Sequence, residues 1–168
     1  MTTLYTASVP VFKQLLTALK NVLTIAETYA TDKKIDPKVL LQSRLYPDMF
    51  PLVRQVQIAA DFAKSVPSRL ASIEVPAYED IEQTFAELQT RIDNTLRILD
   101  GITANQIDGK ESLEIVLRPG TPKEKKLNGE TYLLNYGLPQ FFFHVTTTYA
   151  ILRNNGVEIG KRDFMGAY

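Results

Sequence analysis

The sequence predicts a mostly α fold, a four-helix bundle with a small β-hairpin inserted between helices three and four. Along several long segments, apolar residues recur at three- and four-residue steps, the period of a helix with one buried face. Between residues 113 and 127 the pattern changes to alternation around a Pro-Gly-Thr-Pro turn, which is typical of two short paired strands. At a length of 168 residues, we expect a single domain spanning 1–168.

The first helix is predicted from about Ser8 to Ala30. Ser8 can cap its N-terminus, and Pro10 falls in the first turn, where a missing N–H costs little. A short turn of helix is expected after Asp36-Pro37. The residues predicted to form the core stripe of the first helix are Phe12, Leu15, Leu16, Leu19, Val22, Leu23, Ala26 and Ala30.

The second and third helices follow the same apolar period. Asp48 is interpreted as the N-cap of the second helix, and Pro67 as the place where that helix kinks or ends. A third helix is predicted from roughly Tyr78 to Ile102, with Ile81 in its inward seam and acidic residues in its first turn. The short link around Val75-Pro76 favours antiparallel packing of these two helices.

The last long helix is predicted to begin after the capping residue Asn128 and to end at Asn154-Asn155-Gly156. Its stretch Thr131–Leu152 has no formal charge and is long enough to span a bilayer. Its polar side chains would be costly in hydrocarbon, and Gly137 with Pro139 would break a lone spanning helix. We therefore expect a helix buried among its neighbours, kinked at Pro139, and no membrane association.

Composition excludes several classes of function. Nineteen basic residues balance nineteen acidic ones, so no electrostatic attraction to nucleic acid is expected. The chain has no Cys, which excludes disulfides and thiolate sites. No secretory signal is visible, so we expect a cytoplasmic protein. Neither the Gly-x-Ser-x-Gly turn of hydrolases nor a phosphate-binding glycine loop occurs.

His144 is the only histidine, and it lies on the uncharged last helix. Helix bundles build metal sites from side chains that face inward, and an imidazole is a common ligand. Gln57 and Asp61 are four residues apart, on one face of the second helix, and are the nearest companions for a divalent ion such as Zn, Ni, Fe or Mn. The other interpretation, which we favour, is a hydrogen-bonded core histidine without a metal.

The run Phe141-Phe142-Phe143 covers more than half a turn of the last helix. At least one of its rings must therefore face away from the main core. Such a ring can form a subunit contact or a pocket wall, or it can pack against the hairpin.

Four runs of the sequence resemble an uncharacterised bacterial family, the domain of unknown function 1993, which is grouped with the DinB-like four-helix bundles. The runs are Tyr5-x-x-Ser8-Val9-Pro10-Val11-Phe12, Leu45-x-Pro47-Asp48-Met49-Phe50-Pro51-Leu52-x-x-Gln55-Val56-Gln57, Phe141-Phe142-Phe143-His144-Val145-Thr146-Thr147 and Gly160-Lys161-Arg162-Asp163-Phe164. The resemblance covers essentially the whole chain and implies the DinB-like bundle. It also implies a place for a divalent metal, because many superfamily members hold one with three histidines and some are metal-dependent thiol transferases.

This chain departs from the three-histidine pattern. His144 matches the helix-four ligand in kind and approximate place, but the companion positions hold Thr147 and Thr148, and helix two offers Gln57. We therefore expect a small-ligand-binding or assembly module without a favoured metal, present as a homodimer or higher homo-oligomer. The alternative is a divalent-metal-dependent thiol transferase-like enzyme with an atypical site of His144 and Gln57 or Asp61. The predicted pocket residues are His144, Gln57, Asp61, Thr147, Thr148 and Phe141.

Overall fold

The computed structural model describes residues 2–168 and is mostly helical, as predicted. The long helices are α1 (Val9–Asp32), α3 (Leu52–Leu70), α4 (Phe85–Asp100) and α7 (Leu138–Asn154). The short helices are α2 (Pro37–Gln42), α5 (Ala104–Ile107), α6 (Gly129–Thr131) and α8 (Lys161–Met165), with a π-helix, η1 (Tyr132–Gly137), directly before α7. The two strands are β1 (Glu114–Leu117) and β2 (Lys125–Asn128).

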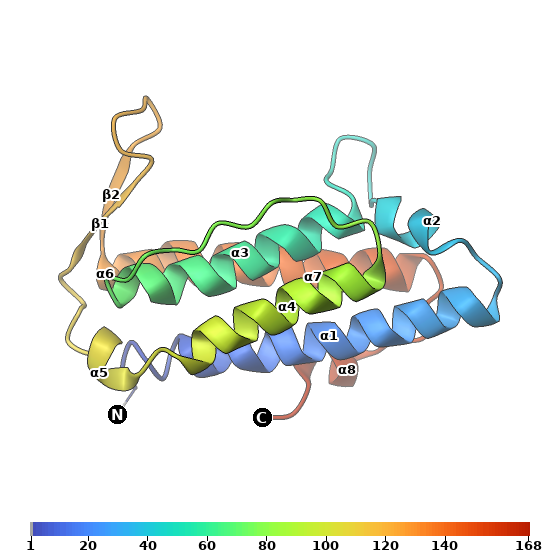
Figure 1. Ribbon diagram of the computed structural model, residues 1–168, viewed down its shortest axis with the longest axis horizontal. Coiled ribbons are helices and arrows are strands. Elements are labelled where there is room, and N and C mark those ends of the chain that lie inside the picture. Colours follow the sequence, from blue (N-terminus) through green and yellow to red (C-terminus); the bar gives the residue numbers. More distant parts are fainter. Residues whose placement is uncertain (1) are drawn as a thin grey trace.

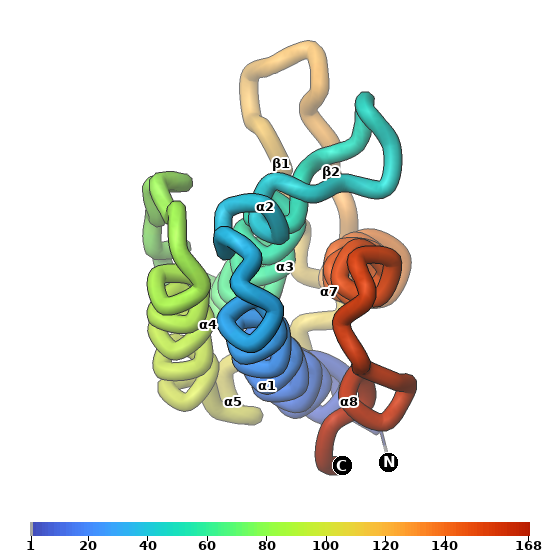
Figure 2. Tube along the Cα trace, turned by 90° about the vertical axis from the view of Figure 1, so that its right-hand side faces the viewer, coloured from blue at the N-terminus to red at the C-terminus, as the bar shows by residue number. Residues whose placement is uncertain are grey.

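The four long helices form a bundle in which α1 and α7 run one way and α3 and α4 run the other (Figure 1). Viewed along the bundle, α4 and α7 lie on opposite sides of the α1 and α3 pair (Figure 2). The predicted antiparallel packing of helices two and three is wrong, because α3 and α4 are parallel. Residues 71–84 return along α3 as an extended linker before α4 begins.

Helix α4 starts at Phe85, seven positions later than the predicted start at Tyr78. The residues before Phe85 therefore belong to the linker. Thr84 and Glu87 form a capping box there: Glu87 N donates to Thr84 Oγ1 at 3.2 Å, and Thr84 N donates to Glu87 Oε2 at 2.9 Å. Ile81 lies in the linker and is 70% exposed, so its assignment to the core was wrong. Ile81 is four residues before Phe85, which is a helical spacing, and this led to the wrong prediction.

Two other predicted caps are corrected by the hydrogen bonds. Ser8 precedes α1, but its hydroxyl donates backwards to Leu4 O at 2.6 Å and does not cap the helix. Asp48 lies in a loop that is closed by a 2.9 Å bond from Leu52 N to Ser43 O, so α3 begins after Pro51. Pro67 does not stop α3, which continues to Leu70.

Other sequence predictions are confirmed. The α1 stripe is buried throughout, and the helical turn after Asp36 is α2. The hairpin pairs β1 with β2 antiparallel, with Ile115 opposite Leu127. Asn128 caps the start of the last helical region by accepting a 2.8 Å bond from Thr131 N, and Gly156 follows α7 with a φ of 88°.

The irregularity expected at Pro139 takes the form of the π-helix η1. The backbone N–H of Leu138 donates to Leu133 O, five residues earlier. Gly137 ends η1 against α3, where an added Cβ would meet Val66 Cγ2 at 2.7 Å. The two helices therefore approach most closely at a residue without a side chain. Among residues 2–168, no helix combines the length and the apolar character needed to cross a bilayer.

Candidate functional site

His144 lies where α7 packs on α3, and its side chain is buried, with 7% exposure. Its Nδ1 is 2.7 Å from Gln55 Oε1. The ring of Phe62 from α3 lies nearly parallel to the imidazole at a centroid distance of 6.2 Å, and the ring of Phe143 meets its edge at 5.2 Å. One amide and two aromatic rings therefore fix the orientation of the only imidazole in the chain.

Burial determines the charge of His144. Loss of water around the ring lowers its pKa from 6.5 to about 4, and the positive charge of Arg54 acts in the same direction. The imidazole is therefore neutral at pH 7. A neutral ring can accept a hydrogen bond on one nitrogen while it donates from the other.

Gln57 and Asp61 do not join His144. The amide nitrogen of Gln57 donates to Glu82 Oε2 at 2.8 Å, and its oxygen accepts from Arg54 at 3.2 Å. Successive helical residues are turned by about 100°, so Gln57 points away from the face that carries Gln55. The sequence correctly placed Gln57 and Asp61 on one face of the helix, but that face packs toward α4.

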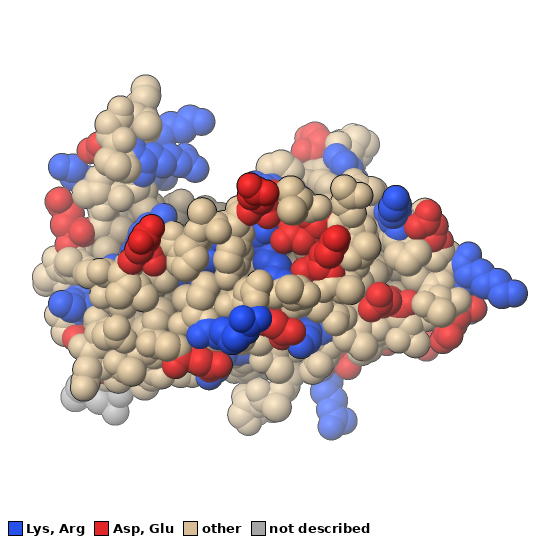
Figure 3. All heavy atoms as spheres, viewed as in Figure 1, with Lys and Arg blue, Asp and Glu red and all other residues tan. Residues whose placement is uncertain are grey.

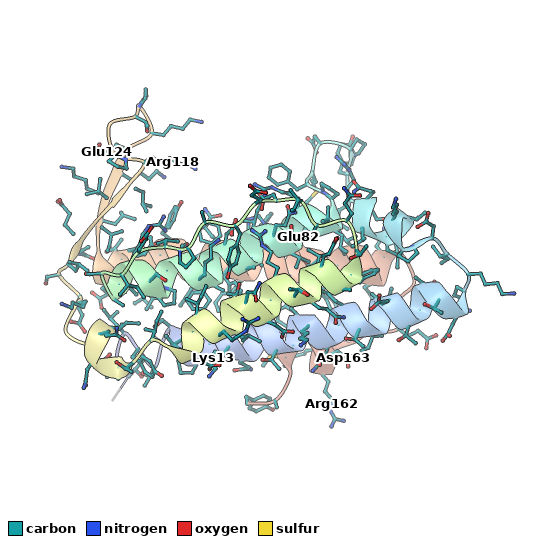
Figure 4. The ribbon with its side chains drawn as sticks, viewed as in Figure 1. Lys13, Glu82, Arg118, Glu124, Arg162 and Asp163 are labelled. Carbon is teal, nitrogen blue, oxygen red and sulfur yellow. The ribbon has the colours of Figure 1, made fainter. Side chains whose placement is uncertain are left out.

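Asp61 belongs to a network of ion pairs centred on Arg91, which is 3% exposed. The Arg91 guanidinium donates to Asp61 at 2.8 Å, and it makes further bonds to residues of the linker. These linker acceptors are Glu79 O at 3.1 Å, Asp80 at 3.0 Å and Glu82 at 2.9 Å. Figure 3 shows acidic and basic atoms gathered over this part of the molecule, and Figure 4 labels Glu82 above α4. The network holds the linker on α3 and α4.

Lys64 completes this network from α3. Its Nζ is 2.9 Å from Asp61 and lies 3.6 Å from the centre of the Tyr78 ring, which the linker supplies. A hollow of about 440 Å³ lies beside the network and is lined by Tyr78, Glu82, Glu87, Arg91 and Asn94 among others. The charged side chains at its floor are already paired with one another, so we assign it a structural role.

Of the remaining predicted pocket residues, Thr147 borders a surface groove, whereas Thr148 and Phe141 are fully buried. Thr148 Oγ1 donates to His144 O at 2.9 Å, and Thr147 Oγ1 donates to Phe143 O at 2.7 Å. Both hydroxyls are therefore bound to the backbone of α7. Phe141 is fully buried and meets the edge of the Phe12 ring at 4.8 Å. Its selection as a pocket residue is corrected, since its ring points into the core.

An apolar groove of about 440 Å³ lies on the outer side of α7, against the loop between α2 and α3. Its apolar lining consists of Leu45, Met49, Pro139, Phe142, Phe143 and Ala150. Thr146 and Thr147 complete the lining, and no charged residue contributes to it. Leu45 and Met49 were not predicted as pocket residues, although the apolar residues gathered in the short loop 43–51 were a signal.

The residues present do not fit the three-histidine metal site of the wider superfamily. Within residues 2–168, no three His, Asp or Glu side chains are grouped so that they could hold a metal ion. Gln57 Oε1 accepts from Arg54, and Asp61 Oδ1 is bound to both Lys64 and Arg91. What His144 has beside it is one amide and a set of aromatic rings.

Comparison with known proteins agrees with this fold. The family model described as "Domain of unknown function (DUF1993)" matches residues 4–165. The structure is similar to the crystal structure of a DinB family member protein from Shewanella denitrificans, with 40% sequence identity and a TM-score of 0.92. That match covers 98% of this chain and 93% of the other. No curated protein matches. The chain therefore belongs to the family of domain of unknown function 1993, within the DinB-like four-helix bundles.

Proposed function

We propose that this protein is an assembly module that pairs with a second copy of itself through the outer face of η1 and α7. The observation that carries the proposal is an exposed helical face that has no charge from Leu134 to Thr146, ahead of the exposed Arg153 near the end of α7. Its exposed residues are Leu134, Asn135, Pro139, Phe142, Phe143 and Thr146. The solvent face of a surface helix normally carries charged residues, and a contiguous apolar face is typical of an interface.

The absence of charge also favours a second copy over an unrelated partner. A twofold contact places the same surface patch of both subunits together, so a charged face would repel itself. The face from Leu134 to Thr146 extends over about 18 Å at the rise of a helix. The neighbouring loop adds more exposed apolar side chains, with Leu45 41%, Tyr46 66% and Phe50 56% exposed.

Sedimentation velocity tests this proposal directly. The wild-type protein is expected to sediment as a dimer, and Phe143→Glu as a folded monomer, because it would place two carboxylates at the contact. Ile81→Glu is the matched control, since Ile81 is exposed on the linker, and this variant is expected to stay dimeric. A wild-type protein that remains monomeric at high micromolar concentration would contradict the proposal.

A second candidate function is the binding of a small apolar or amphipathic ligand in the groove beside α7. The groove, at about 440 Å³, has the size and apolar lining of many ligand sites. Anilinonaphthalene sulfonate is a suitable probe, because it fluoresces on entering apolar sites. Ala150→Phe fills the groove and should abolish the fluorescence gain, whereas Ala86→Phe on the exposed side of α4 should keep it. Equal fluorescence gains in the two variants would reject the groove as the site.

Metal content separates both candidates from the thiol-transferase alternative. That alternative needs two further ligands beside His144, and the nearest predicted ones are bound elsewhere. Mass spectrometry of untagged protein purified without chelator is expected to find no stoichiometric divalent metal. Stoichiometric metal that disappears in His144→Ala would overturn this expectation and make thiol transfer the next activity to assay.

A further inference from the structure

We infer that His144 presents the lone pair of Nε2 as a hydrogen-bond acceptor at the seam between α3 and α7, and that this seam takes a neutral ligand with an O–H or N–H donor on an apolar body. The inference rests on the ligand-binding candidate above, whose groove shares Pro139, Phe142, Phe143 and Thr146 with the proposed dimer face. It follows from the proton positions that the neighbours of the ring impose.

The tautomer of His144 follows from the orientation of the Gln55 amide. Gln55 Nε2 donates to Phe50 O at 3.1 Å, and a backbone carbonyl can only accept. The other amide atom, Oε1, therefore faces His144 Nδ1 at 2.7 Å. Because Oε1 also can only accept, Nδ1 must carry the proton of the neutral ring. Nε2 is left with its lone pair.

This lone pair has no partner within residues 2–168, where the only hydrogen bond of the His144 side chain is the one through Nδ1. Among the buried side-chain nitrogen and oxygen atoms of those residues, only Arg91 Nε lacks a partner. Nε2 of His144 is therefore not sealed in the core, although the side chain as a whole is only 7% exposed. It is an acceptor that a bound molecule can reach.

The surroundings of Nε2 determine the class of ligand. The rings of Phe62 and Phe143 flank the imidazole. Phe143, whose ring meets the edge of the imidazole, and Thr147, one turn further along α7, both line the apolar groove, so the groove adjoins His144. The proton of the Thr147 hydroxyl is already donated to Phe143 O. Nε2 therefore supplies an acceptor beside an apolar wall, and it can orient a ligand that carries one donor.

Anionic ligands are not favoured here, because the nearby cation is already paired. Arg54 binds Asp80 and the oxygen of Gln57. A carboxylate placed at the seam would therefore meet the lone pair of Nε2 without a free positive charge to compensate for its loss of water. A neutral phenol, alcohol or amide has the donor that Nε2 requires and avoids this cost.

The single histidine makes the test direct, because ¹⁵N-histidine labelling reports only the two ring nitrogens of residue 144. At pH 7 we expect the proton on Nδ1 and a lone-pair signal from Nε2. The probes are p-cresol and toluene, which share an apolar ring but differ in the hydroxyl. p-Cresol is expected to shift the Nε2 signal and to bind about tenfold more tightly than toluene. Benzoate is expected to leave the signal unchanged.

Variants of Gln55 supply a control that a merely structural role would not satisfy. Gln55→Leu removes the acceptor, so the Nδ1 proton preference and the discrimination between p-cresol and toluene should both be lost. Gln55→Glu keeps an acceptor beside Nδ1, although it gives up the donor to Phe50 O, and at a pH where the ring is neutral it should retain both, which also covers the case in which the leucine variant does not fold.

Three results would overturn the inference. A proton on Nε2 in the wild-type protein would remove the acceptor. An Nε2 signal that does not shift when p-cresol is added would show that the ligand does not bind at the seam. Equal affinity for p-cresol and toluene would mean that the groove binds apolar rings but does not prefer ligands with a hydrogen-bond donor. Because sedimentation measures assembly and the anilinonaphthalene probe measures the groove, each of these failures is distinguishable from a failure of the proposed functions.

Discussion

The two sides of α3 are covered in opposite ways (Figure 2). Toward α4, buried Arg91 and Lys64 pair with the carboxylates of Asp61, Asp80 and Glu82, and the linker closes over them. Toward α7, the contact consists of apolar side chains and one hydrogen-bonded pair, Gln55 and His144. Among residues 2–168, no ion pair joins α3 to α7.

The charged side chains therefore lie on one side of α3, and the groups that are free to bind a partner or ligand lie on the other. On the α4 side the hydrogen-bonding groups satisfy each other almost completely, and Arg91 Nε is the one buried side-chain atom of residues 2–168 that does not. That side fastens a linker to two parallel helices. On the α7 side there are few polar groups, but Nε2 of His144 lacks a partner and two phenylalanine rings face solvent. Binding is therefore expected on the uncharged side.

The largest expected effect contrasts neighbouring rings on α7. Phe141 is fully buried against Phe12, whereas Phe143 is 55% exposed. Phe141→Ala should lower the free energy of unfolding by about 3 to 5 kcal/mol, because it removes apolar contacts and leaves a cavity. Phe143→Ala should cost less than about 1 kcal/mol in dilute protein. Urea denaturation measures both, and equal losses would show that the triplet has no inner and outer member.

The next effect tests the charged side. Arg91→Ala leaves three carboxylates without their shared partner and should lower the free energy of unfolding by about 3 kcal/mol. Arg97, which bonds to Asn94 on the exposed side of the same helix, is the control, and Arg97→Ala should cost less than about 0.5 kcal/mol. If the two variants unfold at the same urea concentration, the network contributes no more than a surface contact.

The pH dependence of stability tests the uncharged side. The pKa of His144 is lowered from 6.5 to about 4 in the folded protein. Between these two pH values the unfolded chain therefore binds a proton that the folded protein does not bind. The contribution of this ring is therefore complete above pH 6.5 and is lost as the pH falls toward 4. The loss amounts to at most about 3 kcal/mol.

Comparison of the wild-type protein with His144→Phe isolates this contribution, because carboxylates that titrate in the same range are common to both. The unfolding free energy of the wild-type protein minus that of His144→Phe should fall steadily from pH 7 to pH 4. A difference that stays constant with pH would mean that the buried imidazole titrates normally.

Much of the bundle could be predicted because apolar periodicity is a local signal. Phe12, Leu16 and Leu19 mark the buried face of α1 without any knowledge of what covers them. The alternation around Ile115 likewise identified the hairpin. The start of α4 was harder, because Ile81 and Phe85 have helical spacing, whereas Thr84 and Glu87 contain the stronger local signal, a capping box.

The candidate site could be predicted only in part, because the neighbour of each helical face is a tertiary property. His144 was identified from its chemistry alone. Its actual partner, Gln55, lies two residues before the predicted Gln57, and only the packing of α3 between α4 and α7 decides which of the two faces the imidazole. The role of Asp61 depends on Arg91, which belongs to α4 and meets Asp61 only through the packing of α4 on α3.

The smallest expected effect concerns self-association. If the outer face of α7 pairs two copies, dissociation accompanies unfolding, and the melting temperature must rise with protein concentration. Each tenfold increase should raise Tm by about 2 °C for a dimer of this size. Phe143→Glu should remove this dependence, and Arg97→Ala on the opposite side should retain it. A wild-type Tm that is independent of concentration would leave the exposed rings of α7 without a partner subunit and make the groove ligand their remaining explanation.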